Sequence, residues 1–343
     1  MITKKHLIYA AFLVLIGFGA IFGNLYYGKI YKTNVLKTGT IYIPTNASFD
    51  EVESIVRPFL RRVTGFRWVA KKKKYTQRIK SGKYEIKKGM NNNELVNLLR
   101  SGNQTTVKVR FNNQDSLEKL AGRIAQQIEP DSLALLQVMK DEAFWSDNGF
   151  SKANALSMYI PNSYEFYWNT SAASFQHKML KEYKKFWNES RNKKAKKIGL
   201  SPAQVITLAS IVQKETANIP ERKTVAGLYL NRYKNKWPLQ ADPTVIYALK
   251  LKNGMDKEYK QVLYKHLEID SPYNTYKHND LPPGPIGMPD ISAIDAVLTP
   301  SNHDYYFMCA SVSDFGKHVF AKTLAQHNVN ARKYQRWLAK QGY

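Results

Sequence analysis

Glu215 is the residue whose position points most directly to chemistry. It follows a run, 205–212, in which apolar residues recur at helical spacing, and it lies at the edge of that stripe rather than on the opposite polar face. A carboxyl group at such a place is partly removed from water, which raises its pKa and keeps it protonated for use as an acid. The competing interpretation, which helical position alone favours, is an ion pair with Lys214 or Arg222.

A second carboxyl group, Asp242, stands directly before Pro243. Asp is a common N-cap and Pro a common first helical residue, so the pair predicts the start of a helix with Asp242 as its cap. Hydrolysing glycosidases use two carboxyl groups, which leaves Asp242 open as the partner of Glu215 in a hydrolase. The seven histidines include no H-E-x-x-H, and no Cys/His set has zinc spacing, so we expect neither a metal nor another cofactor.

Capping and turn signals place the elements that must hold these two carboxyl groups. Ser201, followed by Pro and then Gln at the third position, begins the helix that leads to the first of them, and another helix starts at 218–221. The Pro-rich stretch 281–287 predicts a stiff loop that can form the wall of a cleft. The segments 305–312 and 317–321 predict a β-hairpin.

The first residues of the chain predict a membrane anchor. An uncharged run from Leu7 to Gly23, extended to Tyr27, is long enough to cross a bilayer as a helix, which takes about 20 residues. A cleaved signal peptide, the alternative, has a shorter apolar region and a small-residue cleavage site, and no clean A-x-A follows this run. Lys4 and Lys5 indicate a cytoplasmic N-terminus, with the rest of the chain outside.

The predicted fold class is α+β, with a small module and a larger domain after the anchor. The module contains two strand–turn–helix units, and the second, with a strand at 81–86 and a helix at 91–99, resembles a LysM-type glycan-binding motif. The run Lys71–Lys74 between the units predicts a solvated loop. The predicted parts are a cytoplasmic tail at 1–6, a transmembrane anchor at 7–27, a linker at 28–39, the LysM-like module at 40–105 and a mixed α/β domain at 106–343.

The charge balance is strongly basic, with 52 Lys and Arg against 27 Asp and Glu, a net charge of +25. Such a surface favours polyanions: nucleic acid, anionic lipid headgroups or anionic wall polymers. A domain outside the membrane does not meet DNA, and no helix-turn-helix, RNP or zinc-finger signature is present, so no nucleic-acid partner is expected. The one cysteine, Cys309, lies in an apolar run and is predicted to be a buried strand residue without a disulfide.

Several long motifs, in the same order over roughly 205–330, resemble those of the endolytic murein transglycosylases, the MltG or YceG-like family. The motifs are Leu208–Thr216, Val225–Gly227, Leu230–Arg232, Pro238–Tyr247, Ser271–Tyr276, Leu281–Ile286 and the terminal Phe320–Thr323 with His327 and Asn328. The family commonly has Glu-Lys-Glu where this chain has Gln213-Lys214-Glu215. The second acidic position is retained, and we interpret Gln213 as the replacement of a surface Glu.

The resemblance implies a single-pass enzyme of the cytoplasmic (inner) membrane, whose catalytic domain lies on the outer, periplasmic side and cuts nascent peptidoglycan glycan strands beside peptidoglycan synthases. It implies a lytic transglycosylase in which Glu215 is the acid. It also places four residues in the cleft as sugar contacts: Gln240, Asp242, Asn274 and Tyr276. Two alternatives stay open. One is a non-catalytic, membrane-tethered scaffold that binds peptidoglycan, and the other is a muramidase-type hydrolase that uses both candidate carboxyl groups.

Overall fold

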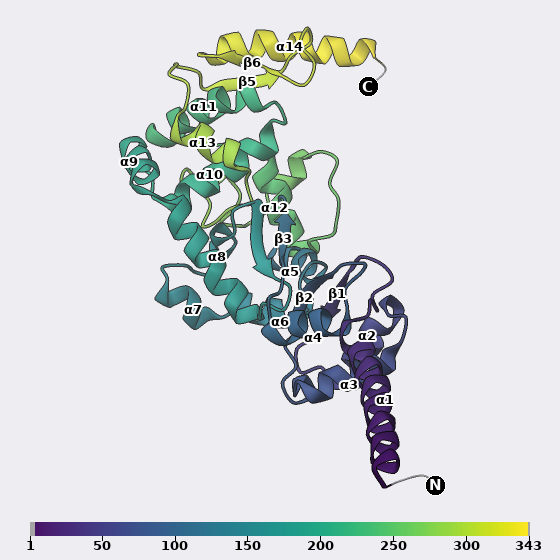
Figure 1. Cartoon of the computed structure of the whole chain (residues 1–343). Coiled ribbons are helices and arrows are strands. Elements are labelled where there is room, and N and C mark those ends of the chain that lie inside the picture. The colour runs from purple at the N-terminus through teal and green to yellow at the C-terminus, as the bar shows by residue number, and fades with distance from the viewer. Residues whose placement is uncertain (1–3, 342–343) are drawn as a thin grey trace. The chain divides into compact units, whose positions relative to one another are not determined.

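The computed structural model describes residues 4–341, which form two compact units. Unit 1 comprises the chain up to Val109 together with Gln127–Pro130 and Glu165–Ser171, and unit 2 comprises Arg110–Gln126, Asp131–Tyr164 and the chain from Ala172 onward. Figure 1 shows that helices make up most of the described chain and that the sheets are small. Each sheet has two strands, paired β1–β2, β3–β4 and β5–β6, so the class is α+β.

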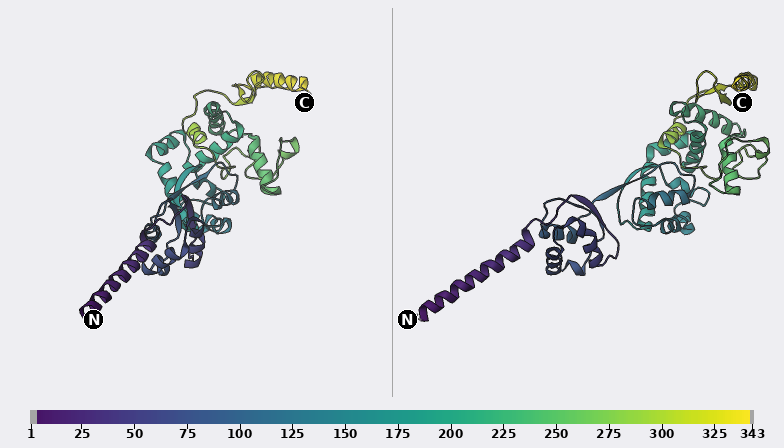
Figure 2. Two further views of the ribbon diagram at one scale, coloured as in Figure 1. Left: turned by 45° about the vertical axis from the view of Figure 1, so that its right-hand side comes forward. Right: turned by 90° about the vertical axis from the view of Figure 1, so that its right-hand side faces the viewer.

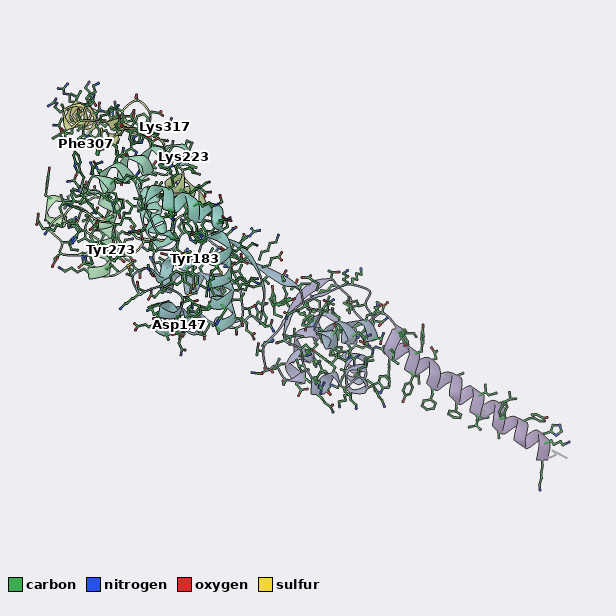
Figure 3. All side chains as sticks on the ribbon, turned by 90° about the vertical axis from the view of Figure 1, so that its left-hand side faces the viewer. Asp147, Tyr183, Lys223, Tyr273, Phe307 and Lys317 are labelled. Carbon is green, nitrogen blue, oxygen red and sulfur yellow. The ribbon has the colours of Figure 1, made fainter. Side chains whose placement is uncertain are left out.

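Helix α1 (Lys4–Tyr31) begins unit 1 as a long apolar helix (Figure 1). Its side chains project freely around the helix in Figure 3, and Leu13 and Leu15 are 68% and 69% exposed. The helix is long and apolar enough to cross a bilayer, and the remainder of the described chain leaves its most apolar stretch uncovered. These properties are consistent with a single-pass anchor or with a signal sequence, and the predicted span 7–27 lies within α1.

Residues 28–39, the predicted linker, begin within α1 and contact the folded part of unit 1. Helix α1 continues into this segment, and the carbonyl of Lys29 accepts a hydrogen bond of 2.8 Å from the side chain of Asn92. Asn34 and Val35 are buried in unit 1, where the amide of Asn34 bonds Asn92 at 2.7 Å. The segment therefore joins α1 to the folded part of unit 1 through core contacts, because its polar and apolar groups both find partners there.

The two strand–turn–helix units of unit 1 meet through their strands. Strand β1 (Gly39–Ile43) pairs antiparallel with β2 (Gly82–Ile86). The helices that follow, α2 (Phe49–Val56) and α4 (Asn92–Ser101), both begin with a capping box, as predicted for the helix after Ser48. Helix α3 (Val63–Lys72) packs against α4 and against α1. The shared core includes Ile43, Phe66, Tyr84, Ile86, Leu95 and Leu99, all fully buried.

Unit 2 is built largely from helices packed around α10. Strands β3 (Thr106–Phe111) and β4 (Asn162–Tyr167) form a two-stranded sheet whose residues are divided between the two units. The helices are α5 (Leu117–Ala125), α6 (Ser132–Met139), α7 (Glu142–Asp147), α8 (Ala172–Phe186), α9 (Glu189–Ile198), α10 (Pro202–Glu215), α11 (Arg222–Lys234), α12 (Asp242–Asn253) and α13 (Ile291–Leu298). Helix α10 contacts α9, α11, α12 and α13, so it is the central element of the unit.

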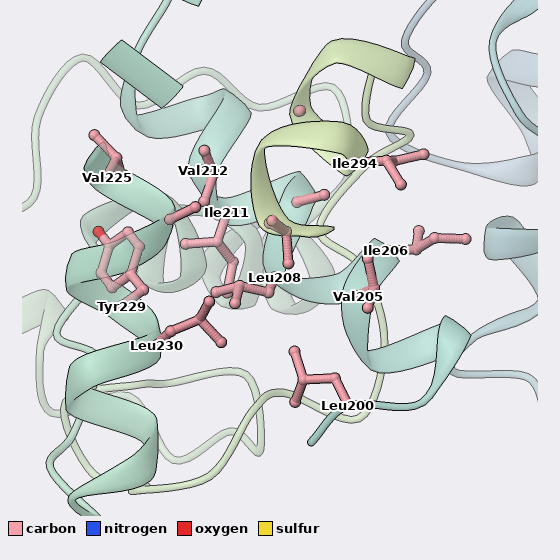
Figure 4. Packing of buried hydrophobic residues seen from close by; sticks show 14 of the residues in the cluster. Leu200, Val205, Ile206, Leu208, Ile211, Val212, Val225, Tyr229, Leu230 and Ile294 are labelled. Atoms are coloured by element: carbon pink, nitrogen blue, oxygen red, sulfur yellow. The ribbon is translucent and has the colours of Figure 1, made fainter. Parts of the chain in front are cut away.

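Helix α10 begins with the predicted capping box, in which Ser201 and Gln204 bond each other's backbone. The prediction of a single apolar stripe was wrong, because every residue of 205–212 is buried. Figure 4 shows this core at close range, with α11 and α13 on either side of α10. The buried hydroxyl of Ser210 accepts a hydrogen bond of 3.0 Å from the backbone of Ile286, which fixes the Pro-rich loop against the helix. A helix that is apolar all round belongs in the interior.

The chain ends in a hairpin and a helix. Strands β5 (Phe307–Ala310) and β6 (His318–Ala321) pair antiparallel, which confirms the predicted hairpin in shorter form. Helix α14 (Leu324–Lys340) contacts both strands and lies along them in Figure 1, and Figure 2 shows it at the C-terminal end of the chain. Cys309 is half-buried rather than buried, because a two-stranded hairpin covered on one face leaves the other face open.

Candidate active site

Glu215 is the last residue of α10, where the buried helix reaches a more open part of unit 2. The buried hydroxyl of Tyr229, on α11, donates a hydrogen bond of 3.1 Å to its Oε2. Burial raises the pKa of Glu215, and the negative charge of Asp242 raises it further. The Tyr229 hydrogen bond and the electrostatic influence of His318 and Arg232 oppose this rise in pKa without reversing it. The carboxyl group is therefore held protonated to higher pH than an ordinary Glu, as an acid catalyst requires.

The expected alternative partners of Glu215 bind elsewhere. The ammonium group of Lys214 lies 2.9 Å from the carboxylate of Asp115, and the guanidinium of Arg222 donates to Ser292 at 2.7 Å. The interpretation of Glu215 as half of an ion pair with either cation is therefore wrong. Gln213 is not a surface residue either, since it is half-buried and its Oε1 accepts a hydrogen bond from the backbone at the start of α13.

Arg232, also on α11, organises the segment that leads into α12. It is only 8% exposed, and its Nε donates to the carbonyl of Tyr306 at 2.7 Å. One terminal nitrogen donates to the carbonyl of Leu239 at 2.8 Å and to Oε1 of Gln240 at 3.2 Å. The guanidinium thus connects the residue before β5 to the segment that precedes α12. Its positive charge also interacts with the carboxyl group of Glu215.

Helix α11 can approach the segment before β5 because it carries a glycine. A Cβ at Gly227 would lie 2.6 Å from the carbonyl of Ser301 and 2.7 Å from the ring of His303. The same close approach lets Asn231 donate a hydrogen bond of 2.8 Å to the carbonyl of His303. Glycine is therefore required at this position by packing, and the contact fixes the face of α11 that carries Tyr229.

Gln240 lies beside the site, exposed, with an unusual backbone. Its φ of 50° is in the left-handed region, which is uncommon for a residue with a side chain. Its backbone N–H donates to the carbonyl of Thr275 at 2.9 Å, and its side chain is oriented by Arg232. Such strain in a non-glycine residue persists only where surrounding contacts enforce it, and it is common at functional sites.

Asp242 does not cap α12, so that prediction was wrong. It is the first helical residue, the N-cap position is Ala241, and no side chain caps the helix. The Asp242 carboxylate is exposed and accepts a hydrogen bond of 2.5 Å from the hydroxyl of Tyr276. A negative charge at the first turn is also favoured by the helix dipole. Asp242 and Tyr276 therefore present their polar groups together near Glu215.

Asn274 is fully buried, and its side-chain amide forms hydrogen bonds with backbone groups of the protein. Its amide nitrogen donates to the carbonyls of Leu267 and Ile269 at 2.8 and 2.9 Å, and its Oδ1 accepts from the backbone of Tyr276 at 3.0 Å. It has no donor left for a sugar. Asn274, which the resemblance places among the sugar contacts, therefore holds the loop that carries Tyr276.

Glu221 and His318 were not recognised as site residues from the sequence. Glu221 is a buried carboxylate whose two oxygens accept hydrogen bonds from the backbone and ring of His318 at 2.6 and 2.9 Å. The same carboxylate accepts a bond of 2.8 Å from the hydroxyl of Thr216, the residue after Glu215. This network fixes the end of α10 to β6. Because the two residues are 97 positions apart, no local pattern links them. The one signal in the sequence is that each lies close to a motif shared with the family.

Most of the chain matches the model of one known protein family. A model described as the YceG-like family matches residues 41–333. This chain belongs to the YceG-like family. Within residues 4–341, no three His, Cys, Asp or Glu side chains are grouped so that they could hold a metal ion.

Named relatives of this YceG-like chain share one description. The endolytic murein transglycosylase of Bacillus subtilis is 31% identical over 91% of this chain and 90% of its own length. The protein of the same name from Streptococcus pneumoniae is 26% identical over 95% of this chain, which spans only 64% of that longer protein. A crystal structure of a yceG-like protein from Listeria monocytogenes has 29% identity and a TM-score of 0.57, covering 85% of this chain and 98% of that one.

A hollow of about 700 Å³ in unit 2 is lined in part by residues of α12. Its wall includes Pro283 and Pro285 of the Pro-rich loop and the aromatic rings of Trp145, Tyr247 and Tyr273. Tyr247 belongs to α12, which begins at Asp242. Helix α12 therefore has one end at the site and one face in the hollow.

Proposed function

We propose that this protein is a lytic transglycosylase that cleaves the MurNAc–GlcNAc bond of peptidoglycan glycan strands and leaves 1,6-anhydro-MurNAc ends. The observation that carries the proposal is the environment of Glu215: a carboxyl group at the end of a buried helix, with a raised pKa and a tyrosine hydroxyl on one oxygen. Membership of the YceG-like family and the names of the relatives support the same reaction.

One such carboxyl group is sufficient for this reaction. Glu215 donates its proton to the glycosidic oxygen as the bond from that oxygen to C1 of MurNAc breaks. The C6 hydroxyl of the same MurNAc attacks C1 and gives its proton to the Glu215 carboxylate, which is thereby returned to its starting form. No water is consumed, because the substrate supplies the nucleophile. The burial that raises the pKa of Glu215 serves the first step.

Three polar side chains around Glu215 are our candidates for sugar contacts. Gln240 and Asp242 are exposed, and Tyr276 is half-buried with its hydroxyl on Asp242. In this proposal Asn274 holds Tyr276 in place through a hydrogen bond to its backbone and touches no substrate. The second candidate function, a hydrolase, would need Asp242 as base or nucleophile. The exposed carboxylate of Asp242 keeps this alternative testable.

The cell-envelope part of the proposal rests on α1 and on the charge of the chain. Helix α1 would cross the cytoplasmic membrane once and hold the catalytic domain on its outer side, where nascent strands are made. There the enzyme would limit strand length beside the peptidoglycan synthases. The paired strand–turn–helix units of unit 1 would act as a LysM-like module that positions glycan. A net charge of +25 suits an anionic wall and membrane surface.

Product analysis tests the proposal. Peptidoglycan digested by the full chain should give, in mass spectrometry, 1,6-anhydro ends that weigh one water less than reducing ends. Reducing ends would establish the hydrolase instead. A scaffold would release no fragments at all, and Glu215→Gln would then change nothing.

A further inference from the structure

A hollow in unit 1 is lined almost entirely by basic and amide side chains. Its volume is about 760 Å³, and it is far in sequence from the catalytic residues. The lining residues are Lys73, Lys74, Gln77, Arg78, Lys80, Asn97, Arg100 and Ser101. Five of these eight described residues are cationic and none is acidic, which is unusual even for a chain of this charge.

The hollow is formed where α3 and α4 end. Lys73 turns inward from the end of α3 and donates hydrogen bonds to the side chains of Asn93 and Asn97 on α4. Lys74 has a φ of 56°, a left-handed conformation that is uncommon for a residue with a side chain. The predicted solvated loop at Lys71–Lys74 is therefore an ordered corner at Lys73 and Lys74, held in place by contacts with α4.

The charge in this hollow is not balanced within the described chain. None of its five cations forms an ion pair there, whereas nearby Arg57 and Arg67 share the carboxylate of Glu53. Burial and the charge of Arg100 lower the pKa of Lys73, which shows that the cations act on one another. Cations at helix C-termini interact favourably with the dipole, by about 0.3–1 kcal/mol each, but two helix ends do not account for five cations.

The donor set suits phosphate chemistry. Two guanidinium groups, Arg78 and Arg100, can each offer paired N–H donors to phosphate oxygens, and the lysines add point charges. A lone carboxylate carries a single charge and would leave most of the five cations uncompensated. A diphosphate, with several charges and oxygens distributed over two phosphorus atoms, matches this set better, and the volume is sufficient for it.

We propose that this hollow binds a phosphate or diphosphate group carried by a lipid at the membrane surface. Helix α3 contacts the end of α1, where the ring of Trp68 packs against that of Tyr26. From Trp68 to Lys73 is five residues, about 7.5 Å of helix, so the hollow begins close to the end of the apolar helix. The binding site rests on unit 1 alone, while its place at a membrane rests on the proposed anchor.

Binding is tested on the detergent-solubilised full chain by calorimetric titration with inorganic diphosphate. Arg78→Gln together with Arg100→Gln should weaken binding at least about tenfold, since two charge-assisted contacts are lost. Both residues are exposed, so the fold should persist. The matched control, Lys87→Gln with Lys88→Gln, removes two exposed cations of unit 1 outside the hollow and should change affinity less than about twofold. Absence of diphosphate binding, or equal loss in both variants, would overturn the site.

Competition distinguishes the sources of the group. Mixed micelles of the same detergent, carrying either phosphatidylglycerol or an isoprenoid diphosphate, are added to the titration. Displacement by one lipid identifies it as the ligand, and displacement by neither overturns the lipid assignment. Cleavage of soluble glycan strands is measured alongside. The Arg78 and Arg100 substitutions should leave it unchanged, so failure of the binding proposal and failure of the proposed enzyme give different results.

Discussion

The hollow of unit 1 and the candidate active site of unit 2 differ in how their charged side chains are paired. In unit 2 the buried Glu221 and Arg232 bind several protein groups each, and Glu215 is held by Tyr229. In unit 1 five cations surround one hollow without a counter-charge from the described chain. A site organised for chemistry needs fixed, satisfied groups around one reactive residue, whereas a site organised for an anion leaves its cations free for it.

The largest expected effect is at Glu215, in the candidate active site. Glu215→Gln keeps the size of the side chain but removes the proton that is donated to the glycosidic oxygen. General acid–base catalysis contributes typically about 10²–10⁴-fold, so cleavage should fall by at least that order. The rate of fragment release from purified peptidoglycan measures it, with circular dichroism to show an intact fold. Near-normal cleavage would remove Glu215 from the mechanism.

Glu221→Gln tests whether the hydrogen bonds of Glu221 with Thr216 and His318 support the candidate active site. The amide cannot accept all three hydrogen bonds that the carboxylate accepts from Thr216 and His318. We expect the free energy of unfolding to fall by about 1–3 kcal/mol, with a partial loss of kcat and little change in KM. The control is Glu268→Gln, an exposed partner of Lys277, which should cost less than about 1 kcal/mol. Equal losses in the two variants would contradict a network role.

Tyr229→Phe should move the pH profile of cleavage in a defined direction. The hydroxyl of Tyr229 lowers the pKa of Glu215, so its removal should raise that pKa further. An acid catalyst is active while protonated, and activity falls as pH rises through its pKa. The alkaline limb of kcat/KM should therefore shift to higher pH in Tyr229→Phe and stay in place in Tyr233→Phe, on the same helix. A shift to lower pH would show that the limb reports a different group.

Local signals in the sequence were sufficient for much of this architecture. The capping boxes at Ser48 and Ser201, the hairpin after residue 305 and the span of α1 all depend on neighbours within a few residues. Glu215 became the candidate acid through its place beside an apolar run and, above all, through the order of the surrounding motifs. Its burial follows from the helix before it, which is why one segment was enough to indicate a raised pKa.

Long-range contacts explain what the sequence did not show. Asp242 has the local signature of a helix cap, but Tyr276, 34 residues later, takes its carboxylate. Asn274 resembles a polar loop residue, and only the fold reveals that its side chain forms hydrogen bonds with three backbone groups. Glu221 meets His318 across 97 residues. No spacing rule connects such positions, because tertiary packing alone brings them together.

The smallest expected effect separates the two reactions that the catalytic centre could perform. Asp242→Asn keeps an oxygen that can accept the hydrogen bond from Tyr276, and it removes a negative charge that raises the pKa of Glu215. In a lytic transglycosylase this costs a few-fold at most by our expectation, because the C6 hydroxyl of the sugar is the nucleophile. The alkaline limb of the pH profile should also move slightly to lower pH.

In a hydrolase the same substitution would remove the base or nucleophile. Cleavage should then fall by about 10² or more, as far as it falls in Glu215→Gln. Comparing the two variants on one peptidoglycan preparation, with the end groups identified by mass spectrometry, therefore tests the reaction twice. A small loss with anhydro ends supports the one-carboxylate mechanism. A large loss with reducing ends would assign Asp242 a direct part in the chemistry and make unit 2 a muramidase.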